Sequence, residues 1–376
     1  MSPLSHFVSL SRRGLFGWGR IAALSMGLVA CGLEDADRRG EANDLSSQVS
    51  LSTENGPSQS PLLHLVKPLE TDAALNNSLW LQDHYVWVDR ERSNGRLFVF
   101  MVGNGNTNSQ FQLLPQEAAR LGYRVIVLTY PNSFAIGPIC AKSLDSACQE
   151  KVRLEIIDGI DRTPVIDIGP VDSIDNRLTR VLRFLTTSYP QEGWSRFLRG
   201  SRTNGTPKWS KVAVGGFSFG SMQAALIGKL RQVDRVAMFG ATLDGSGGAP
   251  GNWVAPGETS PERYYGLLHR QDSMVVQGIA NWTALGLLAF GPFVDEASAA
   301  PPYGGTHALV TDRLPLSGTY VNAHGSVARD DYTPRAKDGT TPALRDAWRY
   351  VLAARHGDDG DDRGNQDGRD DEKADD

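Results

Sequence analysis

The sequence lacks an excess of positive charge. Its 376 residues carry 38 Lys and Arg against 43 Asp and Glu, a net charge of −5, and most of the negative excess lies in residues 356–376. The remainder is close to neutral and offers no basic face, so nucleic acid is not an expected partner. A composition of 40% hydrophobic and 22% charged residues is typical of a globular protein with one large core.

Long apolar runs are also missing. The apolar stretch at 21–30 is shorter than the roughly 20 residues that span a bilayer. It follows Arg12-Arg13, in a context that resembles a twin-arginine export signal, and it ends in Leu28-Val29-Ala30-Cys31, which resembles a bacterial lipobox. We therefore interpret residues 1–31 as a leader, with an ordinary signal peptide or a short membrane anchor as alternatives. The mature protein is expected in the cell envelope, held to a membrane by lipid on Cys31, and Gly32 favours the outer membrane of a Gram-negative cell.

Cysteine is scarce, with three residues in the whole chain. Acylation of Cys31 would leave Cys140 and Cys148 as a pair eight residues apart. In an oxidising compartment such a pair can close a small loop. We expect a disulfide between them, with two unrelated thiols as the alternative.

Two segments lack the apolar residues needed for a core. Residues 32–61 are rich in Asp, Glu, Ser, Asn and Gln and predict a disordered tether. Residues 356–376 are rich in Asp and Gly and predict an acidic disordered tail, which resembles a calcium loop only loosely because Arg363 occupies a ligand position. One folded domain is expected between them, over residues 62–355.

Within that domain, apolar runs alternate with helical patterns, which is typical of an α/β fold with a mostly parallel sheet and helices on both faces. Residues 131–170 interrupt the alternation, and we interpret them as an excursion over the sheet edge or the mouth of an active site. The predicted strands are 84–89, 96–102, 124–129, 212–214, 235–239 and 263–268, and the predicted helices are 111–121, 174–185, a helix after residue 218, and 342–353.

The strongest motif is Gly216-Phe217-Ser218-Phe219-Gly220. It follows the buried apolar run Val212–Val214 and precedes a helical pattern, so it has the strand–turn–helix context of a nucleophile elbow. Ser218 is the predicted nucleophile, and the N–H of Phe219 is a predicted oxyanion donor. A chance match in a Gly-rich chain is the alternative.

The turn Gly103-Asn104-Gly105-Asn106 follows the predicted strand 96–102. It lacks the Gly-Lys-Ser/Thr ending of a phosphate loop. Because ligands bind at the carboxyl ends of parallel strands, Asn104 or Gly105 is predicted to supply the second oxyanion amide, with ordinary turn chemistry as the alternative.

An acid and a base are expected after the elbow. His324 follows a short apolar approach and lies in a predicted loop before the last helix, and it is the predicted base; His307 begins a strand and is interpreted as structural. Asp272 follows the predicted strand 263–268 and is the predicted acid. Asp244 is the alternative acid, or else part of a flexible rim or a substrate contact.

These motifs, together with the runs SIDNRLTRVLRFL, VAVGGFSFGSM and APGNWVAPGETSPERYYGLLHRQD, resemble α/β-hydrolase-fold serine hydrolases, in particular a branch of exported bacterial and fungal hydrolases. The resemblance covers about residues 62–355. It implies a Ser218–Asp272–His324 triad that hydrolyses a small-molecule or acyl substrate, most simply a carboxylic ester, with no metal or cofactor. An amidase, peptidase or acyltransferase using the same residues, and a binding lipoprotein without turnover, remain alternatives.

Overall fold

The computed structural model describes residues 60–353, apart from residues 76, 242 and 243. The predicted leader with Cys31, nearly all of the predicted tether and the predicted acidic tail lie outside the described residues. Between residues 60 and 353, no helix has the length and apolar character needed to cross a membrane.

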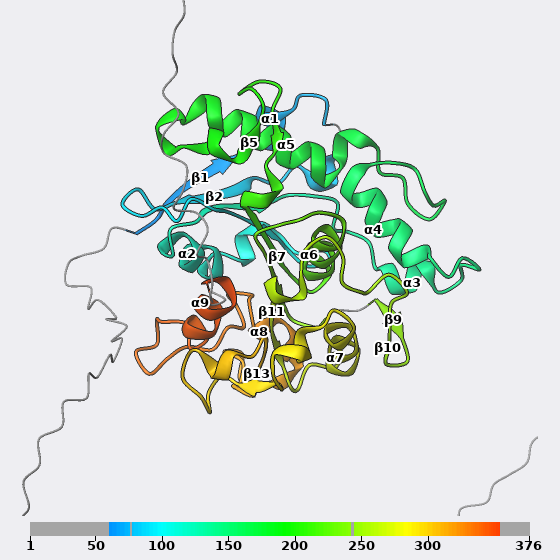
Figure 1. The fold of residues 1–376 in the computed structure, drawn as a ribbon, viewed down its shortest axis with the longest axis vertical. Helices are drawn as coiled ribbons and strands as arrows, with labels where there is room; N and C mark the ends of the chain where they lie inside the picture. Colours follow the sequence, from blue (N-terminus) through cyan, green and yellow to red (C-terminus); the bar gives the residue numbers. More distant parts are fainter. Residues whose placement is uncertain (1–59, 76, 242–243, 354–376) are drawn as a thin grey trace, which may run out of the picture. The chain divides into compact units, whose positions relative to one another are not determined.

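A nine-stranded sheet organises the described part of the chain, in the order β1-β2-β4-β3-β7-β8-β11-β13-β12 (Figure 1). β2 runs antiparallel to both β1 and β4, and all later neighbours in that order pair in parallel. The strands are β1 (Leu62–Val66), β2 (His84–Val88), β3 (Leu97–Met101), β4 (Arg124–Leu128), β7 (Val212–Phe217), β8 (Arg235–Phe239), β11 (Tyr264–His269), β12 (Val294–Asp295) and β13 (Ala308–Thr311).

The central strands are buried along their whole length because both faces of the sheet are covered. Every residue of β3, β7 and β8 is buried, so these strands show no alternation of polar and apolar residues. Figure 1 shows α2 and α9 on one side of the sheet and α4 and α6 on the other. The helices are α1 (Pro68–Thr71), α2 (Leu113–Arg120), α3 (Ile136–Cys140), α4 (Cys148–Asp158), α5 (Ile174–Ser188), α6 (Phe219–Leu230), α7 (Val275–Ala284), α8 (Ala323–Ser326) and α9 (Arg345–Ala353).

The predicted α/β fold with a mostly parallel sheet is confirmed, and six strands fall where the sequence predicted them, although the elbow strand is longer than its apolar run. Two local predictions were wrong. The last helix begins at Arg345 rather than Pro342, because Pro342 pairs with Arg335 in an isolated antiparallel bridge. His324 lies in the short helix α8 rather than in a loop.

The excursion at 131–170 contains two helices, α3 and α4. The disulfide between Cys140 and Cys148 joins the end of α3 to the start of α4, as predicted. α4 then packs against both α5 and α6. The excursion is therefore a covalently closed helical pair beside the elbow helix.

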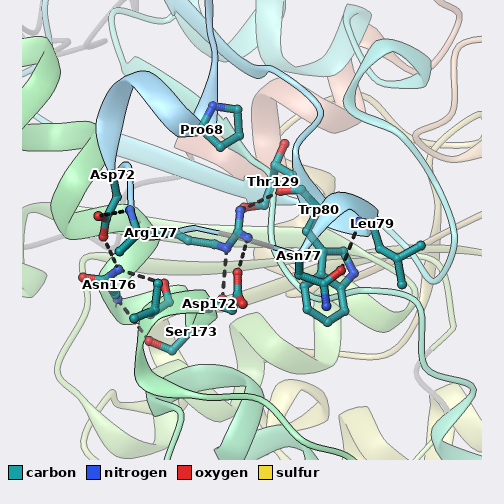
Figure 2. A network of polar contacts seen from close by, with 12 residues as sticks. Pro68, Asp72, Asn77, Leu79, Trp80, Thr129, Asp172, Ser173, Asn176 and Arg177 are labelled. Atoms are coloured by element: carbon teal, nitrogen blue, oxygen red, sulfur yellow. Dashed lines mark hydrogen bonds and ion pairs between the residues drawn. The ribbon is translucent and has the colours of Figure 1, made fainter.

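A polar network ties the start of the described chain to α5 (Figure 2). The buried Arg177 guanidinium donates to the carbonyl of Trp80 at 2.8 Å and to the Asp172 carboxylate at 2.6 Å. Asn176 donates to Asp72 at 2.9 Å. Ser173 caps α5 as predicted, accepting from the Asn176 amide. These contacts fix α5, against which α4 packs.

Candidate active site

Ser218 lies at the turn between β7 and α6, in a backbone conformation that side chains rarely adopt. Its φ of 54° falls in the left-handed region, which costs a non-glycine residue roughly 1–3 kcal/mol. Ser218 is the N-cap residue of α6, yet its side chain makes no capping hydrogen bond. The hydroxyl, on a residue 9% exposed, is therefore not engaged by the helix that it precedes.

The glycines of the motif are needed because the elbow is packed against the end of β3. A Cβ atom on Gly220 would lie 2.0 Å from the carbonyl oxygen of Met101, and one on Gly216 would lie 2.3 Å from the carbonyl carbon of Gly220. Neither position can accept a side chain without moving the backbone. This close approach brings the loop after β3 next to the elbow.

His324 and Asp272 lie within hydrogen-bond distance of each other. The separation between His324 Nδ1 and Asp272 Oδ2 is 2.6 Å. The Asp272 side chain is fully buried, whereas the His324 side chain is 23% exposed. The Met274 amide donates to Asp272 Oδ1 at 2.9 Å, and the Ala241 amide donates to Oδ2 at 3.3 Å. The carboxylate is thus fixed by its own loop and by the end of β8.

The ionisation of Asp272 follows from these contacts. Burial acts to raise the pKa of Asp272, but the hydrogen bond and charge of His324, together with the two backbone amides, outweigh burial and hold the pKa below its ordinary value. An ionised carboxylate can only accept hydrogen bonds. His324 Nδ1 is therefore the donor to this carboxylate, so the carboxylate sets which ring nitrogen carries a proton.

The His324 ring packs against the elbow. Its centroid is 4.8 Å from that of Phe217, the residue before Ser218. A Cβ atom on Gly240, at the end of β8, would come within 3.3 Å of His324 Cε1, so this glycine leaves room for the ring. The α8 segment is held in turn by α9, because Trp348 Nε1 donates to the Val327 carbonyl at 2.7 Å.

Other histidines of the domain have structural surroundings. His269 is buried, with Nε2 2.9 Å from the Arg313 carbonyl and Nδ1 accepting from the Gln271 amide. His307 stacks between Tyr265 and Phe290, each at a centroid distance of 4.0 Å. Burial and the charge of Arg177 lower the pKa of His84 to about 3, so this ring is neutral.

Asp244, the alternative acid, faces an arginine instead of a histidine. Both of its carboxylate oxygens bind Arg153 at 2.6 Å, and Trp253 Nε1 donates to Oδ2 at 2.7 Å. Asp244 is 1% exposed, so the expectation that it lies at a flexible rim was wrong. The carboxylate is already committed to a buried ion pair.

The two loops predicted to supply oxyanion donors differ in what their amides do. The Gly105 amide donates to the Asn132 carbonyl at 2.8 Å, so the prediction of Gly105 as a donor was wrong. Within residues 60–353, the amides of Asn104 and Phe219 have no hydrogen-bond partner. Asn104 and Phe219 thus remain as the predicted donors.

The elbow lies between β7 and α6, the β3–α2 loop lies beside it, and serine, aspartate and histidine follow in that order along the chain. The chain has the α/β-hydrolase fold. Neither a protein-family model nor a curated protein matches this sequence.

Solved structures with this fold are similar to the chain at low identity. An α/β-hydrolase enzyme from a Medee basin deep-sea metagenome is 13% identical, with a TM-score of 0.33, covering 73% of this chain and 92% of its own. A ferulic acid esterase from Anaeromyces mucronatus is 11% identical, with a TM-score of 0.33 and coverages of 80% and 93%. An α/β serine hydrolase from Xanthomonas campestris is 11% identical, with a TM-score of 0.31 and coverages of 72% and 92%.

Sequence reasoning missed Arg153, which reaches the elbow from the excursion. The helix that carries it, α4, is followed by Gly159, whose φ of 75° is the left-handed conformation typical of the residue after a helix. That glycine after a segment of mixed apolar and charged residues was a readable signal. The contact of Arg153 with Asp244 was not, because the two residues lie far apart in the sequence.

Proposed function

We propose that this protein is a serine hydrolase that acts on carboxylic esters through an acyl-enzyme. The observation that carries the proposal is the hydrogen-bonded His324–Asp272 pair, with the His324 ring packed against the residue that precedes Ser218. A histidine held in this way by a carboxylate, and packed on an elbow whose serine hydroxyl does not cap its helix, is what nucleophilic catalysis needs.

In the proposed reaction, His324 Nε2 takes the hydroxyl proton of Ser218 while Oγ bonds to the ester carbonyl carbon. The carbonyl π electrons move to oxygen, and the amides of Phe219 and Asn104 stabilise that charge. Collapse of the intermediate breaks the bond to the alkoxide, which leaves as the alcohol with the proton from His324. Water then gives a proton to His324 and attacks the acyl-enzyme, and Ser218 leaves with that proton as the carboxylic acid is released.

A fluorophosphonate probe tests this proposal. The folded protein should be labelled at Ser218, and Ser218→Ala should abolish the labelling. A matched control is Ser221→Ala: Ser221 lies on the same helix, but its hydroxyl donates to the Ser218 carbonyl. Wild-type protein that is folded yet unlabelled would favour the alternative of a binding protein without turnover. Comparison of p-nitrophenyl esters with the matching anilides then separates esterase from amidase chemistry.

We further propose that the protein works outside the cytoplasm, anchored by acyl chains on Cys31, because the sequence before this cysteine resembles a lipobox. Several acyl chains on one residue anchor more firmly than a single chain, whose binding is marginal. Mass spectrometry of the mature N-terminus should find a lipid-modified Cys31. A mature chain that begins elsewhere, or that retains the leader, would contradict the proposal.

A further inference from the structure

Arg153 in α4 is almost completely buried, yet it lies next to the proposed nucleophile. Its side chain is 2% exposed. Nε and Nη2 each lie 2.6 Å from one carboxylate oxygen of Asp244, a two-point contact that fixes the plane of the guanidinium. This leaves Nη1, which donates to the carbonyl of Phe219 at 3.2 Å.

Arg153 also contacts the Phe219 side chain. Its Cζ atom lies 5.0 Å from the Phe219 ring centroid, within the range of a cation–π contact. On the same ring, Tyr130 stacks at 6.2 Å, and the Tyr130 hydroxyl is itself fixed by the Val102 carbonyl at 2.6 Å. Phe219 is therefore held at its carbonyl and at its ring, while its amide carries no hydrogen bond within the described residues.

Asp244, the ion-pair partner of Arg153, is fixed as well. Its side-chain carboxylate accepts from Trp253 Nε1 at 2.7 Å, and its backbone carbonyl accepts from the Gln277 side chain at 2.9 Å. The next residue, Gly245, donates its amide to Gln149 of α4 at 2.8 Å. The guanidinium thus joins three segments: the excursion helix, the loop after β8, and the first residue of the elbow helix.

We propose that Arg153 is a positioning residue for the oxyanion donor Phe219, and that the disulfide-closed excursion serves as its support. Fixing the carbonyl and the ring of Phe219 restricts rotation about its backbone, and so aims its amide at the site of the developing charge. The Asp244 carboxylate balances the positive charge of the guanidinium. We therefore expect Arg153 to contribute to catalysis by orienting Phe219 and not by adding net positive charge to the site. This inference rests on the proposed hydrolase function.

The test compares variants that keep or remove the contacts to Phe219. Arg153→Lys retains the ion pair with Asp244, but a lysine cannot make the two-point contact and also donate to Phe219. The double variant Arg153→Met/Asp244→Asn leaves no buried charge, and the asparagine oxygen at position 244 can still accept from Trp253. The control is Arg162→Met, which breaks the Arg162–Asp158 ion pair at the other end of the same excursion.

We expect both Arg153 variants to lower kcat for a p-nitrophenyl ester by roughly 10- to 100-fold, with KM changed less than about twofold, as misplacement of a catalytic group does. Affinity for a trifluoromethyl ketone, whose adduct with Ser218 carries an oxyanion, should fall by the same factor. A purely structural role would lower the melting temperature without this parallel loss. Arg162→Met should retain wild-type kcat.

The outcomes separate the two proposals. Wild-type protein that is folded but inert towards ester and fluorophosphonate contradicts the proposed function itself. An active wild type together with a folded Arg153→Lys variant whose kcat and ketone affinity stay within about twofold of wild type overturns the role of Arg153 alone. If the double variant does not fold, Arg153→Lys decides the question.

Discussion

Replacing Asp272 with asparagine probes the proposed acid directly. In the structure, Asp272 Oδ2 lies 2.6 Å from His324 Nδ1, while Oδ1 accepts from the Met274 amide at 2.9 Å. An asparagine has one oxygen and one NH2 group for these two places. If its oxygen stays with Met274, the NH2 group donates to Nδ1, and the proton of the neutral ring moves to Nε2, where it blocks proton transfer from Ser218.

The expected cost follows from that tautomer. Loss of the correct tautomer lowers kcat by about 10⁴-fold, which corresponds to about 5.4 kcal/mol of activation free energy. The opposite orientation would place the NH2 group against the Met274 amide, two donors at 2.9 Å, whereas the first orientation sets it against the more distant Ala241 amide at 3.3 Å, so the first is favoured. Kinetics with a p-nitrophenyl ester measure the effect, and circular dichroism checks that the variant is folded. A folded Asp272→Asn enzyme within tenfold of wild-type kcat would refute the assignment.

Three further outcomes are expected. Asp244→Asn should lower the free energy of unfolding by about 3–5 kcal/mol, because Arg153 is left as a buried unpaired charge, and adding Arg153→Met should restore part of it in urea titrations; additive losses would argue against a coupled pair. Replacing Cys140 and Cys148 together with serine should cost about 2–3 kcal/mol by loop entropy, and an unchanged urea midpoint would contradict this. Burial raises the pKa of Asp330 to about 6, above its unfolded value of about 3.9, so the native state takes up a proton between about pH 6 and 4 and gains stability as pH falls. The melting temperature of the wild type, relative to that of Asp330→Asn, should therefore be higher at pH 5 than at pH 7. A relative melting temperature that is lower at pH 5 would contradict the raised pKa.

The sheet was readable from the sequence because its strands are buried on both faces. Short apolar runs such as Val236–Phe239 stand out against their surroundings, and β8 contains this run after Arg235. The elbow was readable because its glycines are required by backbone contacts within a few residues and with the end of β3. Steric contacts between residues close in the sequence therefore produce a motif that can be recognised in the sequence.

Contacts between segments far apart in the sequence could not be recognised from sequence motifs. The choice between Asp272 and Asp244 depends on which of them faces an arginine, and Arg153 belongs to a segment that the sequence marks only as an interruption. In the same way, the Gly105 amide is not available to an oxyanion because it donates to the Asn132 carbonyl, and Asn132 follows β4, a different segment of the chain. A pattern within one segment does not reveal which partner another segment offers.

The order of the site along the chain has a consequence for biosynthesis. Ser218 and Asp272 are made well before His324, and the α8 segment that carries His324 is held by Trp348, close to the end of the described domain. Because domains generally fold as units during synthesis, an unfinished chain would contain the proposed nucleophile and the proposed acid without a fixed base. If the proposed triad operates, Ser218 would lack its base while the chain is still on the ribosome, and the acyl-enzyme could form only once α8 and α9 have been made and folded.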